Sequence, residues 1–521
     1  MSTFTPTDEQ LEAMRLARTG GSLTIEALAG TGKSSTLRLI AGEFAAARKT
    51  GVATAFNRAI VEDLRSSFPS NVECKTMHSL AFAQAGRPFQ HRLQGRRMRN
   101  IDIADLLGMP RSFQFETDDG KVVDRGRLAS LVMRGVRNFC QTADAEPVTL
   151  HLPGVKGLDL PCDDLHPDNP ASDWRASGRC RHGLGPKHVG HKTSENNDAL
   201  ADMLYPFLGR AWQDWQTPNG RLPYDHSAYL KAFSLGSPRI KADFIMVDEA
   251  QDLPPVFVEV LRRQVGQIIL VGDRQQSIYS FTGAQDAITE FEVANRAWLT
   301  QSFRFGQPIA EVANLYLDAL DAAMMVRGNP AVTSMVSPSR AADAVLCRTN
   351  AGVVREALNG LAAGVKVGVV GGADALIGFA EGALKLQHGL RTDDPNLWMF
   401  GTWDEVEAFV KDDPNGDELA LLVKLVNDFS AEKIIDGMQN LADVRHADLV
   451  VSTAHKAKGL QWSRVRVADG FAKDNPETGE FPSAEELRLQ YVAATRAQHA
   501  LDPEGLFLAD FLKGRPEPMF V

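Results

Sequence analysis

The sequence predicts an α/β protein made of two parallel-sheet domains, each interrupted by a mainly helical insertion. Two observations support this prediction. Short apolar runs alternate with stretches of helical spacing over the first 85 residues, and the same alternation returns near residue 241 and again from residue 298. Polar or glycine-rich turns follow these runs. Strands that alternate with helices pair in parallel, because each helix returns the chain across the sheet.

The first domain is assigned to residues 1–85 and 241–297, with residues 86–240 as its insertion. Its expected strands lie in "SLTIEALAG", "GVATAFN", "NVECKTMHSLAF", "ADFIMVDEAQD" and "QIILVGDRQQSIYSF". Each of these runs is short, apolar and bounded by turn residues, as buried strands are. Helical spacing follows the first two runs, in "KSSTLRLIAGEFAAAR" and "RAIVEDLRSSF".

The second domain is assigned to residues 298–372 and 446–521, with a smaller insertion at 373–445. Its expected strands lie in "ADAVLCRTNA", "GVKVGVVGG", "ADLVVSTAHKAKG" and "RVRVADGF". Pro503 follows the next apolar run, and proline cannot donate to a sheet ladder. We therefore expect the last strand of this sheet to be missing or displaced.

Composition indicates a globular protein of a reducing compartment. The chain has 521 residues, of which 44% are hydrophobic and 23% charged, and its five cysteines are scattered. We see no apolar run long enough for a membrane span and no signal-peptide pattern at the N-terminus, so we expect a cytoplasmic or nuclear protein. A net charge of −10 argues against a uniformly basic surface that coats nucleic acid, but it permits a local basic groove.

One segment of the first insertion, Val155–Glu195, is poor in large apolar residues and is expected to be a long loop. It contains a set of potential zinc ligands, namely Cys162, Cys180, His182, His188 and His191. Their spacing matches no paired cysteine pattern, so we favour a solvated loop over a metal site.

The stretch "EALAGTGKSSTL" resembles the phosphate-binding pattern G-x-x-x-x-G-K-[ST], with Ala27 in place of the first glycine. The positions that must be small and leave backbone N–H groups free are Gly30 and Gly32. Lys33 can reach the β- and γ-phosphates, and Ser34 has the hydroxyl that ligates Mg²⁺. The alternative is a glycine-rich turn that happens to contain lysine.

A pair of carboxylates ends the apolar run "FIMVDEAQD". The carboxyl ends of parallel strands are where α/β proteins bind ligands. Asp248 is suited to support Mg²⁺, and Glu249 to orient and deprotonate an attacking water. The alternative is a helix N-terminus with favourably placed acids.

Ten stretches, in this order, resemble the superfamily 1 DNA helicases of the UvrD/Rep type. They are "TDEQLEA", "ALAGTGKSS", "TAFNRAI", "CKTMHSLAF", "VDEAQD", "LVGDRQQSIYSFTGA", "LTQSFRF", "VLCRTNA", "STAHKAKGLQW" and "LRLQYVAATRA". The wording of "FPSNVECKTMHSLAF" is closest to the F-box DNA helicase branch, although no F-box is evident. In this family alanine commonly opens the phosphate loop. The resemblance implies a P-loop NTPase with two RecA-like domains and ATP between them.

The resemblance also implies the residues of the ATP site. The catalytic set is Lys33, Asp248, Glu249, Gln276, Arg304 and Arg496, with Ser34 and Asp248 holding Mg²⁺. Gln10 would hydrogen-bond the adenine edge, and Gln276 would sense the γ-phosphate. The nucleotide-binding set is Gln10, Ala27, Leu28, Ala29, Gly30, Thr31, Gly32, Lys33, Ser34, Ser35, Gly459, Gln461 and Tyr491. Gln461 stands where the family mostly has glutamate, so we expect weaker discrimination of the nucleotide sugar.

For DNA, the resemblance implies contacts along a single strand from Phe56, Asn57, Thr76, His78, Tyr279, Phe281, Arg348 and His455. Aromatic rings stack on bases and polar groups hold phosphates, although any of these rings could equally belong to the core. The basic run "HRLQGRRMRN" could grip duplex backbone or form a solvated helix face.

The expected activity is that of an ATP- and Mg²⁺-dependent helicase or translocase. It would move 3′ to 5′ on single-stranded DNA and at single/double-strand junctions, in repair, recombination or replication. One alternative is a DNA-stimulated ATPase that strips proteins from DNA with little unwinding, because the second insertion is short. Another is a nucleotide-gated DNA-binding protein without turnover.

Overall fold

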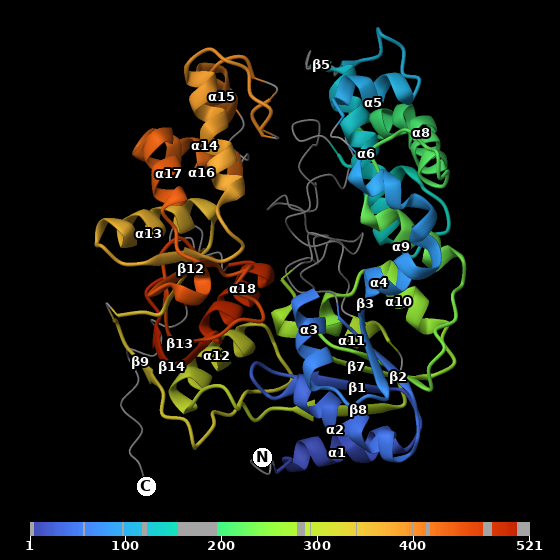
Figure 1. Cartoon of the computed structure of the whole chain (residues 1–521), viewed down its shortest axis with the longest axis vertical. Coiled ribbons are helices and arrows are strands. Elements are labelled where there is room, and N and C mark those ends of the chain that lie inside the picture. The colour runs from blue at the N-terminus through green and yellow to red at the C-terminus, as the bar shows by residue number, and fades with distance from the viewer. Residues whose placement is uncertain are drawn as a thin grey trace, which may run out of the picture.

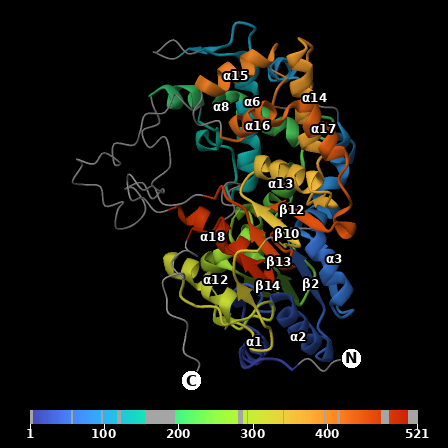
Figure 2. The same ribbon diagram turned by 90° about the vertical axis from the view of Figure 1, so that its left-hand side faces the viewer.

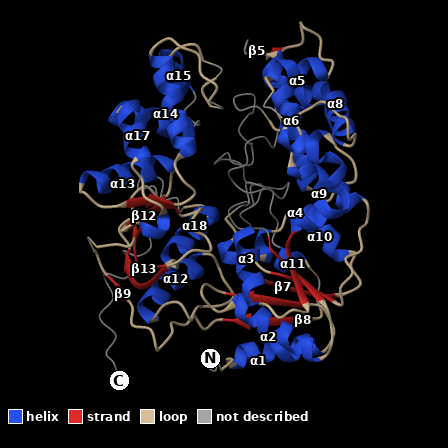
Figure 3. Ribbon diagram, in the orientation of Figure 1, coloured by secondary structure: helices blue, strands red, loops and turns tan. Residues whose placement is uncertain are grey.

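The computed structural model has two lobes side by side, each built on its own sheet (Figure 1). It describes residues 5–55, 58–95, 98–116, 122–154, 195–278, 287–291, 293–339, 341–394, 396–398, 400–412, 417–471 and 482–507. Figure 3 shows the strands of the two sheets in red, with helices packed around them. Among the described residues, no helix combines the length and the apolar character that crossing a membrane requires.

The first sheet has six parallel strands in the order β3-β2-β6-β7-β1-β8. The strands are β1 (Leu23–Ala27), β2 (Gly51–Ala55), β3 (Val72–Thr76), β6 (Phe244–Val247), β7 (Gln267–Gly272) and β8 (Asn295–Leu299). One face of the sheet is covered by three helices that share an apolar core with it: α1 (Asp8–Arg18), α2 (Lys33–Ala46) and α3 (Arg58–Ser67). The other face carries α10 (Pro255–Arg262) and α11 (Ala287–Glu290).

The first insertion is mainly helical where it is described, and it rises above the first sheet in Figure 1. α4 (Met77–Ala81) leads from β3 toward it, and its helices are α5 (Asn100–Leu106), α6 (Arg125–Gln141), α8 (Glu195–Trp215) and α9 (His226–Leu235). Shorter helical turns are η1 (Phe82–Gly86), η2 (Arg87–Gln94) and η3 (Thr149–His151), and β4 (Phe115–Glu116) pairs antiparallel with β5 (Val122–Val123). Residues of these helices share one apolar core with β2, β6 and β7, so the insertion and the first sheet form one packed body.

The second sheet also has six parallel strands, in the order β11-β12-β10-β13-β14-β9. They are β9 (Met335–Val336), β10 (Ala344–Cys347), β11 (Val367–Val369), β12 (Leu449–Thr453), β13 (Trp462–Val467) and β14 (Ala497–Asp502). One face packs against α12 (Gln307–Ala319) and α18 (Ala484–Ala494). The other packs against α13 (Asn350–Ala362) and the second insertion, α14 (Asp374–Gln387), α15 (Trp403–Asp412), α16 (Asp417–Phe429) and α17 (Ala431–Gln439). Figure 2 shows α14 to α17 stacked above the second sheet.

The predicted fold class is confirmed, and three details of the prediction are wrong. Residues Trp298 and Leu299 belong to β8, which pairs with β1, so the first sheet extends past the expected boundary at 298. The last strand is present, because β14 ends at Asp502 and Pro503 follows it without needing to donate to the ladder. The run expected as a third strand is strand only to Thr76, where α4 begins. The cysteines and histidines of the zinc hypothesis lie outside the described residues.

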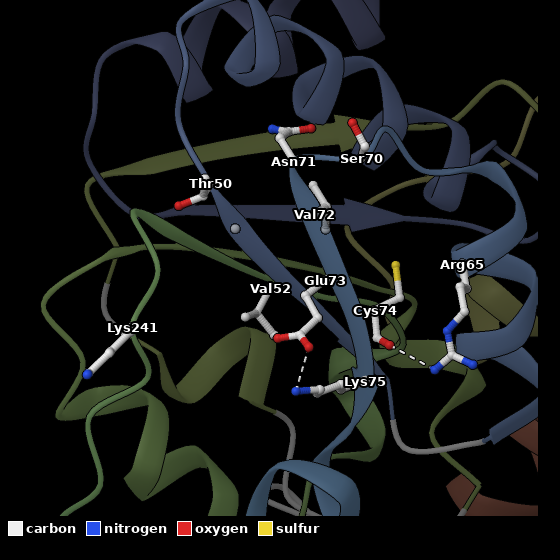
Figure 4. A pocket seen from close by; sticks show the side chains of 11 residues that line it. Thr50, Val52, Arg65, Ser70, Asn71, Val72, Glu73, Cys74, Lys75 and Lys241 are labelled. Carbon is white, nitrogen blue, oxygen red and sulfur yellow. Dashed lines mark hydrogen bonds and ion pairs between the residues drawn. The ribbon is translucent and has the colours of Figure 1, made fainter.

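Strand β3 forms one edge of the first sheet, and a hollow of about 560 Å³ runs along it (Figure 4). Arg65 donates from Nη2 to the backbone oxygen of Cys74 at 3.0 Å, and Lys75 pairs with Glu73 at 2.6 Å. Lys241 lies at the far end of the hollow. The residues that line it include none of the predicted nucleotide-binding set, so it is separate from the site described next.

Candidate nucleotide site and DNA-binding face

The phosphate loop connects β1 to α2 and depends on two glycines in left-handed conformations. Gly30 has φ 74° and Gly32 has φ 82°, a region that residues with a Cβ enter at a cost. A Cβ at Gly30 would lie 2.7 Å from both the Cβ of Arg304 and Oγ of Ser302. Gly32 is the N-cap of α2, so the first N–H groups of this helix point into the loop. Ala27, where the pattern has glycine, is a fully buried strand residue.

A hydroxyl and a carboxylate meet beside this loop. Ser34 Oγ donates to Asp248 Oδ2 at 2.7 Å, which joins the start of α2 to the end of β6. Burial and the neighbouring Glu249 raise the pKa of Asp248 to about 6. Oxygen donors of this kind are those that Mg²⁺ prefers, and a bound cation would offset the cost of burying the carboxylate. The residues present therefore fit a magnesium ion.

Glu249 is held in a strained conformation next to these groups. Its φ is 54°, which is unusual for a residue other than glycine and is often found at functional sites. Gln251 Nε2 donates to its Oε2 at 2.6 Å, and Lys33 Nζ lies 3.8 Å from its Oε1. Burial opposes ionisation, but Lys33 and Lys458 outweigh it and hold the pKa of Glu249 below its usual range. The carboxylate is thus ionised at neutral pH and able to accept a hydrogen bond from water.

Gln10 is fully buried against the same loop. Its Nε2 donates to Thr36 Oγ1 at 3.1 Å, and its Oε1 accepts from the Thr7 N–H as part of the capping box of α1. A Cβ at Gly32 would lie 3.3 Å from Gln10 Nε2. The structure therefore places this predicted adenine contact directly beside the phosphate loop, with its amide held between α1 and α2.

Both predicted arginines reach the same region. Arg304, in the loop after β8, donates to Gln461 Oε1 and to the Thr495 carbonyl, each at 2.8 Å. Arg496, after α18, donates from Nη2 to Gln276 Oε1 at 3.1 Å. Burial and the charge of Arg304 lower the pKa of Arg496 to about 9, so it stays charged at neutral pH. Side chains from the two domains are therefore joined beside the phosphate loop.

The remaining nucleotide-binding predictions surround this cluster. Leu28, Ala29 and Thr31 are buried in the loop itself. Ser35, the third residue of α2, accepts from Arg38 Nη2 at 2.8 Å. Gly459 has φ 86° in the turn between β12 and β13, two residues before Gln461.

Three residues near these groups, Asp273, Lys458 and Asp252, were not assigned a role from the sequence. Asp273 follows β7, is 1% exposed and accepts from Gln276 Nε2 at 2.6 Å and from the Tyr491 hydroxyl at 3.2 Å. Lys458 donates to both oxygens of Asp252, at 2.8 and 2.6 Å, and to the Gln276 carbonyl at 2.5 Å. The signal for Asp273 was available, because it ends the apolar run "QIILVGD" as Asp248 ends "FIMVD".

The described DNA candidates lie at the carboxyl ends of strands in both sheets. Thr76 ends β3 and accepts from the Ser79 N–H at 3.0 Å, and His78 lies in α4 with Nδ1 3.4 Å from the Tyr229 hydroxyl. Arg348 follows β10 and donates to Glu486, while His455 follows β12. The other candidates, Phe56, Asn57, Tyr279 and Phe281, lie outside the described residues.

Two histidines of this face are neutral at neutral pH. Burial lowers the pKa of His78, and burial with the charges of Arg348 and Lys458 lowers the pKa of His455 to about 4. Each imidazole can therefore donate or accept a hydrogen bond but carries no positive charge. In the basic run, Arg92 is buried and pairs with Asp214 at 2.6 Å, so this arginine holds the insertion together.

The sequence matches an AAA domain over residues 10–282 and a UvrD-like helicase C-terminal domain over residues 410–502. The chain is 28% identical over 506 residues to F-box DNA helicase protein 1 of Schizosaccharomyces pombe, covering 88% of the chain and 53% of that protein. It is 29% identical over 489 residues to F-box DNA helicase 1 of Gallus gallus, covering 86% of the chain and 44% of that protein.

A third relative, DNA helicase IV of Escherichia coli (strain K12), is 26% identical over 302 residues, covering 53% of the chain and 34% of that protein. The chain thus spans about half the length of the first two curated relatives. The match to the AAA domain alone covers more than half of the chain, and the C-terminal match lies in the second lobe. The chain belongs to the family of UvrD-like helicases.

Proposed function

We propose that this protein is an ATP-dependent DNA helicase that moves 3′ to 5′ along single-stranded DNA. The observation that carries the proposal is the cluster of polar side chains from both domains around one phosphate loop. Lys33, Ser34, Asp248 and Glu249 come from the first domain, and Arg496 reaches Gln276 from the second. Such an arrangement suits ATP hydrolysis that depends on domain closure.

The chemistry follows from the positions of these groups. The N–H groups at the start of α2 and the Lys33 ammonium would hold the β- and γ-phosphates. A magnesium ion held by Ser34 and Asp248 would neutralise charge that develops between these phosphates. Glu249 would orient the attacking water and accept its proton. Arg304 and Arg496 would stabilise the transferred phosphoryl group, a role worth about 10³–10⁵ in rate in related chemistry.

Movement on DNA would follow from the same closure. The candidates Thr76 and His78 belong to the first domain, and Arg348 and His455 to the second. Because the nucleotide would lie between the domains, ATP binding and hydrolysis would change the distance between the DNA contacts of the first domain and those of the second. The 3′ to 5′ direction rests on the resemblance to UvrD/Rep helicases. We place the activity at single/double-strand junctions in DNA repair, recombination or replication.

The first test separates nucleotide binding from hydrolysis. Glu249→Gln keeps the hydrogen-bonding shape and removes the base, so ATP binding should persist while turnover falls at least a hundredfold, within the roughly 10²–10⁴ that a general base contributes. ATP hydrolysis is measured with and without single-stranded DNA, and with RNA in its place. Glu259→Gln, on α10 and paired with Arg263, is the matched control and should keep wild-type turnover. Near-normal turnover in Glu249→Gln would assign the base to another residue.

The second test concerns direction and product. Duplexes with a 3′ or a 5′ single-stranded tail are incubated with ATP and Mg²⁺, and strand separation is measured beside displacement of streptavidin from a biotinylated end. We expect activity on the 3′ tail alone. Streptavidin displacement with little unwinding would favour the protein-stripping alternative, in keeping with a second insertion of only four helices in the described residues. Preferential activity on 5′ tails would contradict the proposed direction.

A further inference from the structure

We infer that Tyr491 and Asp273 form a positioning pair that sets Gln276 and Arg496 for ATP hydrolysis only when the two domains meet. This inference rests on the proposed function. It concerns two residues that would touch neither the γ-phosphate nor the attacking water, but that connect the groups that do.

The Tyr491 hydroxyl uses both of its hydrogen-bonding capacities across the domain boundary. Tyr491 belongs to α18 of the second domain and is 0% exposed. Its hydroxyl donates to Asp273 Oδ2 at 3.2 Å and accepts from the Ala29 N–H at 3.1 Å. Ala29 lies in the phosphate loop after β1, and Asp273 lies in the loop after β7. One oxygen atom therefore contacts two separate loops of the first domain.

Asp273 connects Tyr491 to two of the proposed catalytic residues, Gln276 and Glu249. Its Oδ2 also accepts from Gln276 Nε2 at 2.6 Å, and its backbone N–H donates to Gln251 Oε1 at 3.0 Å. Gln251 in turn donates to Glu249 at 2.6 Å. The proposed γ-phosphate sensor and the proposed base are thus both one or two hydrogen bonds away from Asp273.

The contacts close into a ring. Arg496 lies five residues after Tyr491 and donates to Gln276 Oε1 at 3.1 Å. Tyr491, Asp273, Gln276 and Arg496 are therefore joined in sequence, two from each domain. The ring can form only while α18 lies against the loop after β7. The Tyr491 hydroxyl also accepts from the Ala29 N–H of the phosphate loop. Closure of the domains would therefore fix the positions of Arg496 and of the phosphate loop at the same time.

The test removes one oxygen atom. Tyr491→Phe keeps the ring that packs in the core of the second domain and deletes its hydroxyl. We expect turnover of ATP in the presence of single-stranded DNA to fall about tenfold, the effect of losing one hydrogen bond in the transition state, with KM for ATP nearly unchanged. Binding of ADP with aluminium fluoride and Mg²⁺, which mimics that state, should weaken by the same factor, and binding of ADP alone should not.

Tyr316→Phe is the matched control. Tyr316 is also 0% exposed, packs in the same core and donates to Gln490 Oε1 at 3.0 Å, a hydrogen bond within the second domain. Its turnover should equal that of the wild type. Asp273→Asn replaces one carboxylate oxygen by an NH2 donor, so the side chain can no longer accept from the Gln275 N–H, Gln276 Nε2 and the Tyr491 hydroxyl together. It should lower turnover at least as much as Tyr491→Phe does, and the double variant should lose less than the product of the two effects, because the two residues act through one network.

Several results would overturn the inference. They are unchanged turnover in Tyr491→Phe and Asp273→Asn, an equal loss in Tyr316→Phe, or a rise in KM without a fall in turnover. A wild-type protein that hydrolyses no ATP would instead contradict the proposed function. Should Tyr491→Phe fail to fold, the same measurements on Asp273→Asn decide the question.

Discussion

At the scale of single residues, Gly30 lies where the phosphate loop passes closest to the loop after β8. We predict that Gly30→Ala lowers the free energy of unfolding by about 2–4 kcal/mol. A residue with a Cβ is strained at this left-handed φ, and the added Cβ would be packed too closely against Arg304 and Ser302. ATP turnover should fall with it, because Arg304 must move. Thermal unfolding midpoints and ATPase assays measure both effects.

Gly364→Ala provides the control for this substitution. Gly364 has φ 76°, close to that of Gly30, but a Cβ there would meet nothing within 4 Å. It should therefore show the backbone cost alone, about 1–2 kcal/mol, and keep wild-type turnover. Equal destabilisation by the two substitutions would mean that the contact with Arg304 contributes nothing.

Most of the proposed catalytic side chains could be predicted individually from the sequence, because their motifs are local. Lys33 and Ser34 follow a glycine-rich turn, and Asp248 and Glu249 end an apolar run. Asp273 also ends an apolar run, so its place could have been found from the sequence, whereas Lys458 follows no such run. The contacts of both residues could not be predicted. Their partners, Tyr491 and Asp252, lie about two hundred residues away along the chain, and nothing in a single sequence reports such a contact.

At the scale of elements, strands were predicted well where apolar runs end in turn residues, and less well where another force sets the end. The expected third strand becomes helix at Met77, because Thr76 caps α4 with its side chain. Pro503 was expected to leave the last strand missing or displaced, but the strand is present and ends at Asp502. In the first case the capping role of Thr76 was missed, and in the second the effect of the proline was placed too early in the strand.

The helices of the first insertion depend on a carboxylate that serves two of them. Asp225 caps α9, accepting from the Ser227 N–H at 2.8 Å, and accepts from Arg137 Nε of α6 at 2.7 Å. We predict that Asp225→Ala destabilises the insertion by about 1–2 kcal/mol, the usual cost of a lost N-cap. Urea unfolding followed by circular dichroism measures this. Asp225→Asn keeps a capping oxygen and should recover most of the loss; an equal loss in both variants would assign the effect to the charge.

At the scale of the whole molecule, the sequence predicted two parallel-sheet lobes with helical insertions, and this is the fold. It could not predict how the lobes meet, since that depends on side chains of one lobe fitting loops of the other. The ion pair between Lys458 and Asp252 is one such contact, with side chains 8% and 6% exposed. Burial raises the pKa of Asp252 to about 6 even with Lys458 beside it.

We predict that Lys458→Met moves the two lobes apart in the nucleotide-free protein. The change leaves Asp252 buried without its partner, and a broken buried ion pair costs about 3–5 kcal/mol, which separation of the domains would relieve by hydrating the carboxylate. The radius of gyration from small-angle X-ray scattering should increase.

Two further variants serve as a rescue and a control for the scattering measurement. Adding Asp252→Asn to Lys458→Met removes the buried charge and should restore the compact form. Arg15→Met breaks the exposed pair with Glu12 on α1 and should leave the scattering unchanged, because surface pairs contribute little. Scattering from Lys458→Met that matches the wild type would show that other contacts hold the lobes together.

The edge of the first sheet has a consequence for how the protein behaves in concentrated solution. An open strand edge invites pairing with the edge of another chain and hence aggregation. Along β3, the Arg65 guanidinium donates a hydrogen bond to the Cys74 carbonyl, and the Pro69 carbonyl accepts from the Val72 N–H at 3.1 Å. Neither of these two backbone groups is then available to pair with another strand. The charged side chains of Glu73 and Lys75 add hydrated groups to the same border. The hollow beside β3 is thus bordered by groups that discourage a second molecule from extending the sheet, which favours solubility of the folded chain.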